Sequence, residues 1–232
     1  MKMRIFGLSA FLCACACTAA SNPAASSPAA SAITIYYSFD TQPNPAAWKS
    51  AQSEVARIFD PASVSINWRL LDAHGGEADS ELVVVRFHGA CTTDHWQSAG
   101  RGLPARGGYS LADSDISNGQ ILPFADVDCD ALRGYLAGER FADPAASLGR
   151  AMARVLSHEI YHILTASAAH AHSGIARAEH SRAELTANTF AFGRTETDWL
   201  REWSARSRMA AAPPSSVDEA GAAATDAEAG LR

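Results

Sequence analysis

The sequence lacks a surplus of basic residues, a long hydrophobic run and any internal repeat. Its 232 residues carry 19 basic and 25 acidic side chains, which gives a formal net charge of −6. A protein that binds nucleic acid by neutralising phosphates needs a basic face, so this balance argues against that class of function and against docking on anionic lipid by charge alone. A hydrophobic fraction of 47% and a charged fraction of 19% are ordinary for a globular protein, and the length suits one substantial domain.

The most apolar run is short and stands at the N-terminus. Lys2 and Arg4 precede the apolar residues 5–12, and this run is too short to span a bilayer as a permanent helix. A short positive end followed by such a run is typical of an export signal. We therefore expect residues 1–20 to direct export and to be removed.

Three cysteines fall within this segment, and their setting bears on how the chain is processed. The sequence Leu-Cys-Ala-Cys over residues 12–15 resembles the lipid-attachment site of bacterial lipoproteins, which indicates Cys15 as the lipidated residue and Cys17 as the second choice. Ordinary cleavage near residues 18–20 would instead release a soluble protein. The expected location is the periplasm, the outer membrane as a lipoprotein, or the outside of the cell, with membrane contact only through the N-terminal lipid.

Once the signal is set aside, only Cys91 and Cys129 remain. An even pair of cysteines in an oxidising compartment predicts a disulfide bond. This bond would close a loop of about 39 residues, worth roughly 4 kcal/mol in the loop-entropy treatment. A metal-ligand role is the alternative, but His95 is the only partner at short spacing from either cysteine.

Alternation of apolar and polar residues, together with a nearly all-apolar run at residues 82–87, predicts five strands, and spacings of three and four predict two long helices. The helical spacing follows Asn44-Pro45 up to residue 59, and it recurs from Asp143-Pro144 to about residue 168. The turn at residues 117–119, Ser-Asn-Gly, indicates a hairpin between the last two strands. This order of elements predicts an α+β fold, with a mixed, mostly parallel, twisted sheet of about five strands and helices packed on it. The expected strands cover residues 33–39, 64–70, 82–87, 109–117 and 120–127.

The remaining segments set the expected domain boundaries. Small residues with two prolines make residues 21–32 a tether, and Ala, Pro, Ser and acidic residues predict disorder over 207–232. Ser181 and Glu184 have the spacing of a capping box that opens a short helix, and residues 197–203 are expected to form a last helix. Residues 33–206 then make a single domain, which we expect to be a monomer.

Five of the eight histidines lie between residues 158 and 180. Among them, His158-Glu159-Ile160-Tyr161-His162 forms an H-E-x-x-H pattern on the second long helix. Residues i and i+4 lie on one helix face, so two imidazoles can bind one Zn²⁺ while the glutamate lies beside the open coordination position. Zinc lowers the pKa of a bound water towards 7, and the carboxylate can take the proton as the water attacks a carbonyl.

The region resembles the zincin metallopeptidases, and the order of elements is most similar to their metzincin branch. There, a sheet of about five strands with two helices ends in the H-E-x-x-H helix. The resemblance implies His158 and His162 as zinc ligands, Glu159 as the general base, one zinc ion as cofactor, and a peptide or protein as substrate. The implied activity is that of a zinc metalloendopeptidase.

The third zinc ligand stays open at this point. The metzincin pattern continues with a glycine and a third histidine, where this sequence has Thr165 and Ala168. A turn after the helix, aided by Gly174, would let His170 complete the site, and His172 is the competing choice.

Two glutamates are further alternatives, because another zincin branch takes its third ligand from a glutamate on a following helix. Glu184 and Glu179 lie 22 and 17 residues after His162, although Glu184 has a simpler role in the capping box. His180 could remain outside the metal shell and donate a hydrogen bond to the developing oxyanion, or it could be an ordinary solvated loop residue.

Zincins of this architecture hold an extended peptide against the edge strand nearest the zinc helix. The resemblance implies that this strand includes Gly108, Tyr109, Ser110 and Leu111. Two alternatives to the peptidase remain, a zincin-fold binding protein and a hydrolase of non-peptide amides or esters. The presence of Glu159 favours an enzyme, since a purely structural zinc would take a fourth protein ligand.

Overall fold

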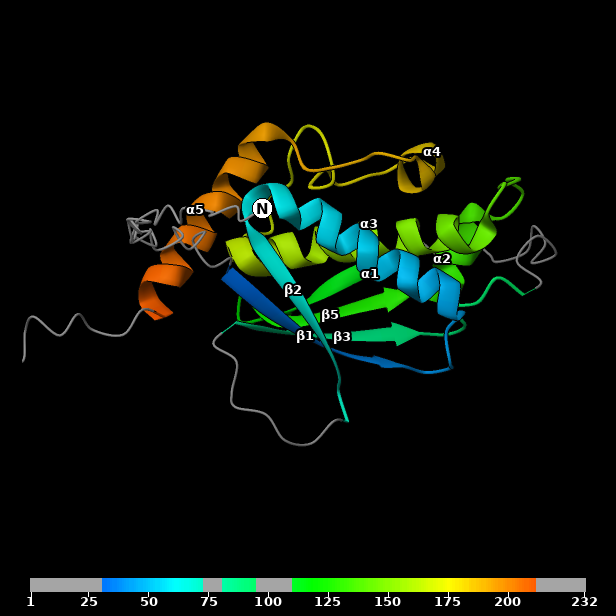
Figure 1. Ribbon diagram of the computed structural model, residues 1–232, viewed down its shortest axis with the longest axis horizontal. Coiled ribbons are helices and arrows are strands. Elements are labelled where there is room, and N and C mark those ends of the chain that lie inside the picture. The colour runs from blue at the N-terminus through cyan, green and yellow to red at the C-terminus, as the bar shows by residue number, and fades with distance from the viewer. Residues whose placement is uncertain (1–30, 73–80, 95–109, 212–232) are drawn as a thin grey trace, which may run out of the picture.

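The computed structural model describes residues 31–72, 81–94 and 110–211 (Figure 1). The expected export signal, the lipidated Cys15 and most of the expected tether lie outside the described residues. Within those described ranges, no helix combines the length and the apolar content needed to cross a membrane.

The centre of the fold is a five-stranded sheet with the order β2-β1-β3-β5-β4. The first four strands in this order are mutually parallel, and β4 runs antiparallel to β5. The expected α+β fold with a mixed, mostly parallel sheet is therefore confirmed. The strands are β1 (Ser31–Phe39), β2 (Val64–Leu70), β3 (Leu82–His88), β4 (Ala112–Ser117) and β5 (Gln120–Asp128).

The helices lie mainly on one face of this sheet (Figure 1). Asn44 caps the first long helix by accepting hydrogen bonds from the next turn, and Asp143 caps the second, each with a proline in the first turn. The two long helices pack closely, because a Cβ on Gly149 would lie 2.4 Å from the carbonyl oxygen of Ala47. The helices are α1 (Pro45–Phe59), α2 (Cys129–Leu136), α3 (Pro144–Thr165), α4 (Arg182–Thr186) and α5 (Arg194–Ala211), with a 3-10 turn η1 at Asp60–Ala62.

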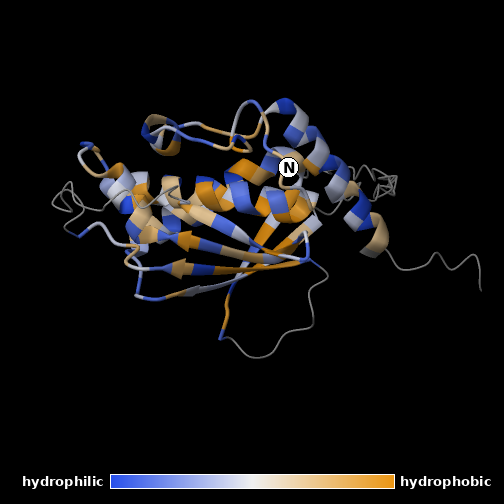
Figure 2. Ribbon diagram, turned by 180° about the vertical axis from the view of Figure 1, so that it is seen from behind, coloured by the Kyte–Doolittle hydropathy of each residue, from blue (hydrophilic) through white to orange (hydrophobic). Residues whose placement is uncertain are grey.

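The strand alternation puts one set of side chains under α1 and α3. Ile33, Ile35, Val83 and Val85 are fully or almost fully buried there, whereas Tyr36, Val84 and Arg86 on the other face are half-buried. In Figure 2 the strands are orange along much of their length, with blue residues among them. The second long helix is buried along most of its length, as expected for a helix packed between a sheet and other helices.

An ion pair is buried beneath these helices. The side chain of Arg154 in α3 is 0% exposed and donates to Glu54 Oε1 of α1 at 2.7 and 2.9 Å. Its remaining donors reach the backbone carbonyls of Glu184 and Ala187 at 2.6 and 2.7 Å. Because two of these contacts lead to α1 and two to the region around α4, Arg154 ties both to the helix that carries the histidine motif.

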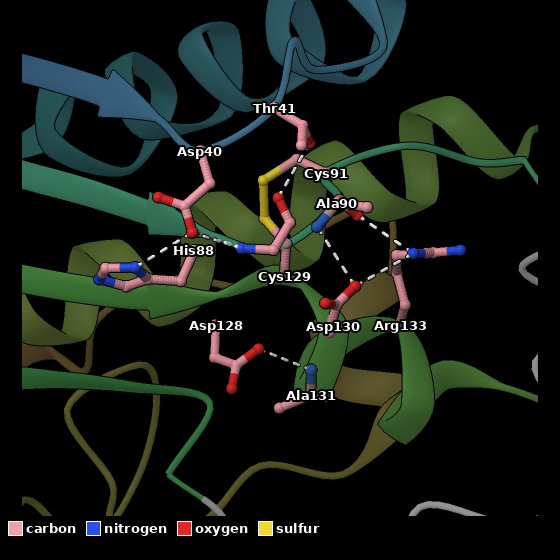
Figure 3. The surroundings of a disulfide bond; sticks show 11 residues. Asp40, Thr41, His88, Ala90, Cys91, Asp128, Cys129, Asp130, Ala131 and Arg133 are labelled. Atoms are coloured by element: carbon pink, nitrogen blue, oxygen red, sulfur yellow. Dashed lines mark hydrogen bonds and ion pairs between the residues drawn. A yellow bond between two sulfur atoms is a disulfide. The ribbon is translucent and has the colours of Figure 1, made fainter.

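Cys91 and Cys129 form the expected disulfide (Figure 3). It joins the loop after β3 to the first residue of α2, and both cysteines are fully buried. Close to it, Asp130 accepts a hydrogen bond from the backbone N–H of Ala90 at 3.2 Å and pairs with Arg133 at 3.2 Å. The bond therefore fixes α2 against the carboxyl end of β3.

The structure corrects several boundaries. The second long helix ends at Thr165 rather than near residue 168, because Ala166 adopts a left-handed conformation with φ 46° that stops the helix. The last helix continues to Ala211, so the expected disorder from residue 207 is wrong over its first five residues. Ser31 and Ala32 belong to β1 and not to the tether, and α2 was not expected at all.

Candidate metal centre

The two histidines of the motif meet on one face of α3. His158 and His162 are only 8% and 6% exposed, and their Nε2 atoms lie 3.0 Å apart. Each ring is held by its other nitrogen: His158 Nδ1 donates to the carbonyl of Ile175 at 2.7 Å, and His162 Nδ1 donates to the carbonyl of Ser167 at 2.6 Å. A carbonyl can only accept, so in both neutral rings Nδ1 carries the proton and Nε2 presents a lone pair.

His170 comes to the same point from the loop after α3. Its ring stacks on that of His158 with 5.2 Å between centroids and meets His162 edge-on at 4.9 Å. One nitrogen from each of the three rings lies within 4.8 Å of the other two. The left-handed conformation of Ala166 ends α3, and directly after His170 a hydrogen bond of 2.8 Å from the N–H of Ala171 to the carbonyl of Ala176 closes the next loop.

This arrangement fits a zinc ion. Two lone pairs 3.0 Å apart repel each other unless a cation or a proton lies between them, and two nitrogens bound to one tetrahedral zinc lie about 3.3 Å apart. Backbone carbonyls that fix the outer nitrogen of each imidazole are the usual support for histidine ligands. Three imidazoles leave the fourth position open, which is the donor set of catalytic rather than structural zinc.

Glu159 lies next to this cluster and is 7% exposed. Burial raises the pKa of its carboxyl group to about 7, with Asp113 adding to the effect and a hydrogen bond from Ser114 opposing it. The Ser114 hydroxyl donates to Glu159 Oε2 at 2.7 Å. A carboxyl group with a pKa near 7 can both accept and release a proton at neutral pH, as a general base requires.

A cavity of about 660 Å³ opens over the three histidines and Glu159. Its wall includes Ser110 and Leu111, just before the edge strand β4, and Ala112 within it. The structure therefore places Ser110 and Leu111 of the expected substrate segment beside the histidines, but it begins the strand at Ala112. Gly108 and Tyr109 lie outside the described residues.

The alternative ligands occupy other positions. Glu184 completes the capping box with Ser181 and pairs with Arg177 at 2.7 Å, contacts that lower the pKa of its carboxyl group to about 2. His172 is exposed and does not join the histidine group. Glu179 lines the cavity wall without joining that group.

His180 supports the cluster from behind. Its Nε2 donates to the carbonyl of Ile175 at 3.0 Å, the same oxygen that accepts from His158. The hydroxyl of Tyr135 in α2 donates to the backbone carbonyl of His180 at 2.8 Å. His180 also lines the cavity, but its Nε2 is engaged with the backbone, so the structure gives this nitrogen a supporting contact rather than a free donor for an oxyanion.

The sequence did not predict the contacts that Ser114 and Tyr135 make with the site. Strand alternation could have placed Ala112, Ser114 and Ile116 on one side of the expected strand, but nothing in the sequence says that this side faces Glu159. Tyr135 lies on the unexpected helix α2, although Asp128 is a recognisable N-cap for it.

No protein-family model and no curated protein matches this chain. Among solved structures, the chain is similar to a crystal structure of archaemetzincin from Methanopyrus kandleri, with 13% sequence identity and a TM-score of 0.44. That alignment covers 75% of this chain and 96% of the other.

Proposed function

We propose that the protein is a zinc-dependent metallopeptidase that hydrolyses peptide bonds, with Glu159 as its general base. The observation that carries this proposal is the convergence of three imidazole nitrogens beside a buried carboxyl group at the floor of one cavity. His158, His162 and His170 would hold the ion. A zinc ion bound there supplies Lewis acidity, which polarises a carbonyl group and makes water a better nucleophile at neutral pH.

The protein's own groups then divide the remaining work. Glu159 accepts the proton of the attacking water and can return it to the leaving amine, because its pKa is close to neutral. The carbonyls of Ile175 and Ser167 fix the rings of His158 and His162, so that both Nε2 lone pairs would be free to bind the ion. Burial of His158, His162 and Glu159 lowers the local dielectric constant and strengthens each of these electrostatic effects.

An extended peptide is the substrate that the cavity accommodates. Among the strands of the described residues, β4 pairs only with β5, so the backbone groups on its other side can pair with a substrate strand. The cavity wall runs from Ser110 along β4 to Ile116, parallel to the direction such a peptide would take. A peptide in this position lies beside Glu159.

We also propose that the protein acts after export. The apolar N-terminal run with its preceding Lys2 and Arg4 supports this, as does the buried disulfide, since disulfides persist mainly in oxidising compartments. Attachment of a lipid at Cys15 is part of this proposal.

The experiment that tests the function compares the wild type with Glu159→Gln. The purified wild type should bind zinc and cleave members of a peptide library, whereas Glu159→Gln should retain zinc and lose about 100-fold or more in kcat/KM. Glu202→Gln is the matched control, because Glu202 is exposed on α5 and is not among the residues that line the cavity. Full activity in Glu159→Gln would refute the assigned base, and zinc binding without cleavage by the wild type would favour a binding protein.

A further inference from the structure

The edge strand β4 makes one side-chain contact with the proposed general base. The Ser114 hydroxyl donates to Glu159 Oε2 at 2.7 Å, and it also lies 3.4 Å from the backbone oxygen of Glu159. Ser114 is half-buried and lines the same cavity as the histidines. Among the hydrogen bonds of the described residues, this is the one that reaches the Glu159 carboxylate.

The regular pairing of β4 with β5 sets the side of the sheet on which this hydroxyl lies. Ser114 pairs with Ala125, whose side chain is fully buried beneath the helices, so both point towards α3. The register shifts only after Ser114, where Ile116 pairs with Ile121. Ser114 therefore faces α3 as a consequence of strand alternation.

We infer that Ser114 is a positioning residue that holds the Glu159 carboxylate in the orientation needed for proton transfer. This inference rests on the proposed function. The terminal torsion of a glutamate side chain is broad, so a carboxylate without a partner samples many orientations. The hydrogen bond fixes Oε2 on the strand side and leaves Oε1 as the oxygen that accepts the proton.

This role predicts a specific kinetic pattern. Ser114→Ala should lower kcat roughly 10-fold, a fraction of what a general base contributes, and should change KM less than about twofold. Ser114→Thr should restore most of kcat, because it keeps the hydroxyl and suits a strand. Ser117→Ala is the matched control, since Ser117 is exposed at the end of the same strand and should behave like the wild type.

Two further measurements separate positioning from general damage. Zinc affinity and the visible spectrum of the cobalt-substituted protein should be the same in Ser114→Ala and the wild type, because Ser114 does not contact the histidines. In the Glu159→Gln background, Ser114→Ala should cause no further loss of residual activity, as expected for a residue that acts through Glu159.

The contact also has a signature that needs neither metal nor turnover. In metal-free protein at pH 9, infrared difference spectra should show a shifted carboxylate stretch in Ser114→Ala. The shift should be absent in Ser114→Thr and in the Glu159→Gln background.

Distinct outcomes overturn the role and the function. An active wild type whose Ser114→Ala variant is equally fast overturns the role alone, and so does a slow Ser114→Ala variant that has lost zinc affinity or that threonine does not rescue. Absence of hydrolysis by the zinc-loaded wild type overturns the proposed function and this role with it.

Discussion

Two groups of side chains in this protein have ligand atoms close enough to share a metal ion. They differ in burial and in the contacts that their members make. His158, His162 and His170 bring ligand atoms within 4.8 Å of one another, and so do three aspartates on the far side of β4 and β5, Asp113, Asp115 and Asp126. The histidine group lies over α3 beneath a cavity, and its first two members are buried. The aspartate group lies on the other face of the sheet, where its members are exposed or half-buried.

The two groups differ in the hydrogen bonds and ion pairs that their members already make. Arg86 donates to both oxygens of Asp126 at 2.7 and 2.8 Å and to Asp115 at 3.3 Å, and His88 Nε2 lies 2.9 Å from Asp126. Asp126 and Asp115 therefore have a counter-charge in place, although burial and the two neighbouring carboxylates raise the pKa of Asp113. His158 and His162 spend their N–H groups on backbone carbonyls instead, and their Nε2 lone pairs lie 3.0 Å apart. Proximity of ligand atoms is thus a weak criterion for a metal site, and unspent lone pairs are a strong one.

The largest effect that we expect from this comparison is on zinc affinity, measured in one variant of each group. His162→Ala should weaken zinc binding about 100-fold or more, because it removes one of three imidazole ligands. Asp126→Asn should leave zinc affinity within about twofold, since Arg86 and His88 already pair with Asp126. Competition with a chromophoric chelator would give both constants. A large loss in Asp126→Asn would move the metal site to the other face of the sheet.

Histidines in or beside the two groups should also have pKa values that are shifted in opposite directions. Burial lowers the pKa of His158 to about 4, with contributions from the neighbouring histidines, whereas the hydrogen bond to Asp126 raises the pKa of His88 above its usual 6.5. In metal-free protein, histidine resonances followed by NMR should show His158 titrating well below His88. Reversal of this order would contradict the environments described here.

These shifts have opposite consequences for stability. The raised pKa of His88 means that its contribution is present below pH 6.5 and is lost as the pH rises through the folded-state value, and solvent exposure of 46% keeps it small. The lowered pKa of His158 means that metal-free protein loses stability as the pH falls from 6.5 towards 4, because the unfolded chain takes up the proton first. Bound zinc should suppress this acid sensitivity, which denaturation with and without the metal would reveal.

Local sequence patterns predicted much of the fold and part of the site. The i, i+4 spacing of His158 and His162 is a property of the helix itself, so the sequence could place both rings on one face with Glu159 beside them. Strand alternation likewise predicted five strands, and Ser117-Asn118-Gly119 predicted their hairpin, where Asn118 and Gly119 take φ 51° and 77°.

The sequence could not predict contacts between segments that are distant in the chain. The position of His170 depends on Ala166, an alanine in a left-handed conformation that propensity does not anticipate. The support of His158 comes from the carbonyl of Ile175, and backbone atoms leave no trace in a sequence motif. Ser114 meets Glu159 because β4, which runs antiparallel to β5, lies beside α3. The two residues are 45 positions apart in the chain, so no local pattern links them.

The smallest expected effect concerns the stability of the aspartate group. Asp115→Asn removes a single ion pair with Arg86, in which both side chains are more than 40% exposed, so the free energy of unfolding should fall by about 0.5 kcal/mol. The loss should shrink further in high salt, because exposed charges are screened, and added zinc should stabilise the variant as much as it stabilises the wild type. Urea denaturation at two salt concentrations, with and without zinc, measures all three quantities. If Asp115→Asn abolished the stabilisation by zinc, the aspartates would have to bind the ion despite their counter-charges, and the distinction between satisfied and unsatisfied ligands would fail in this protein.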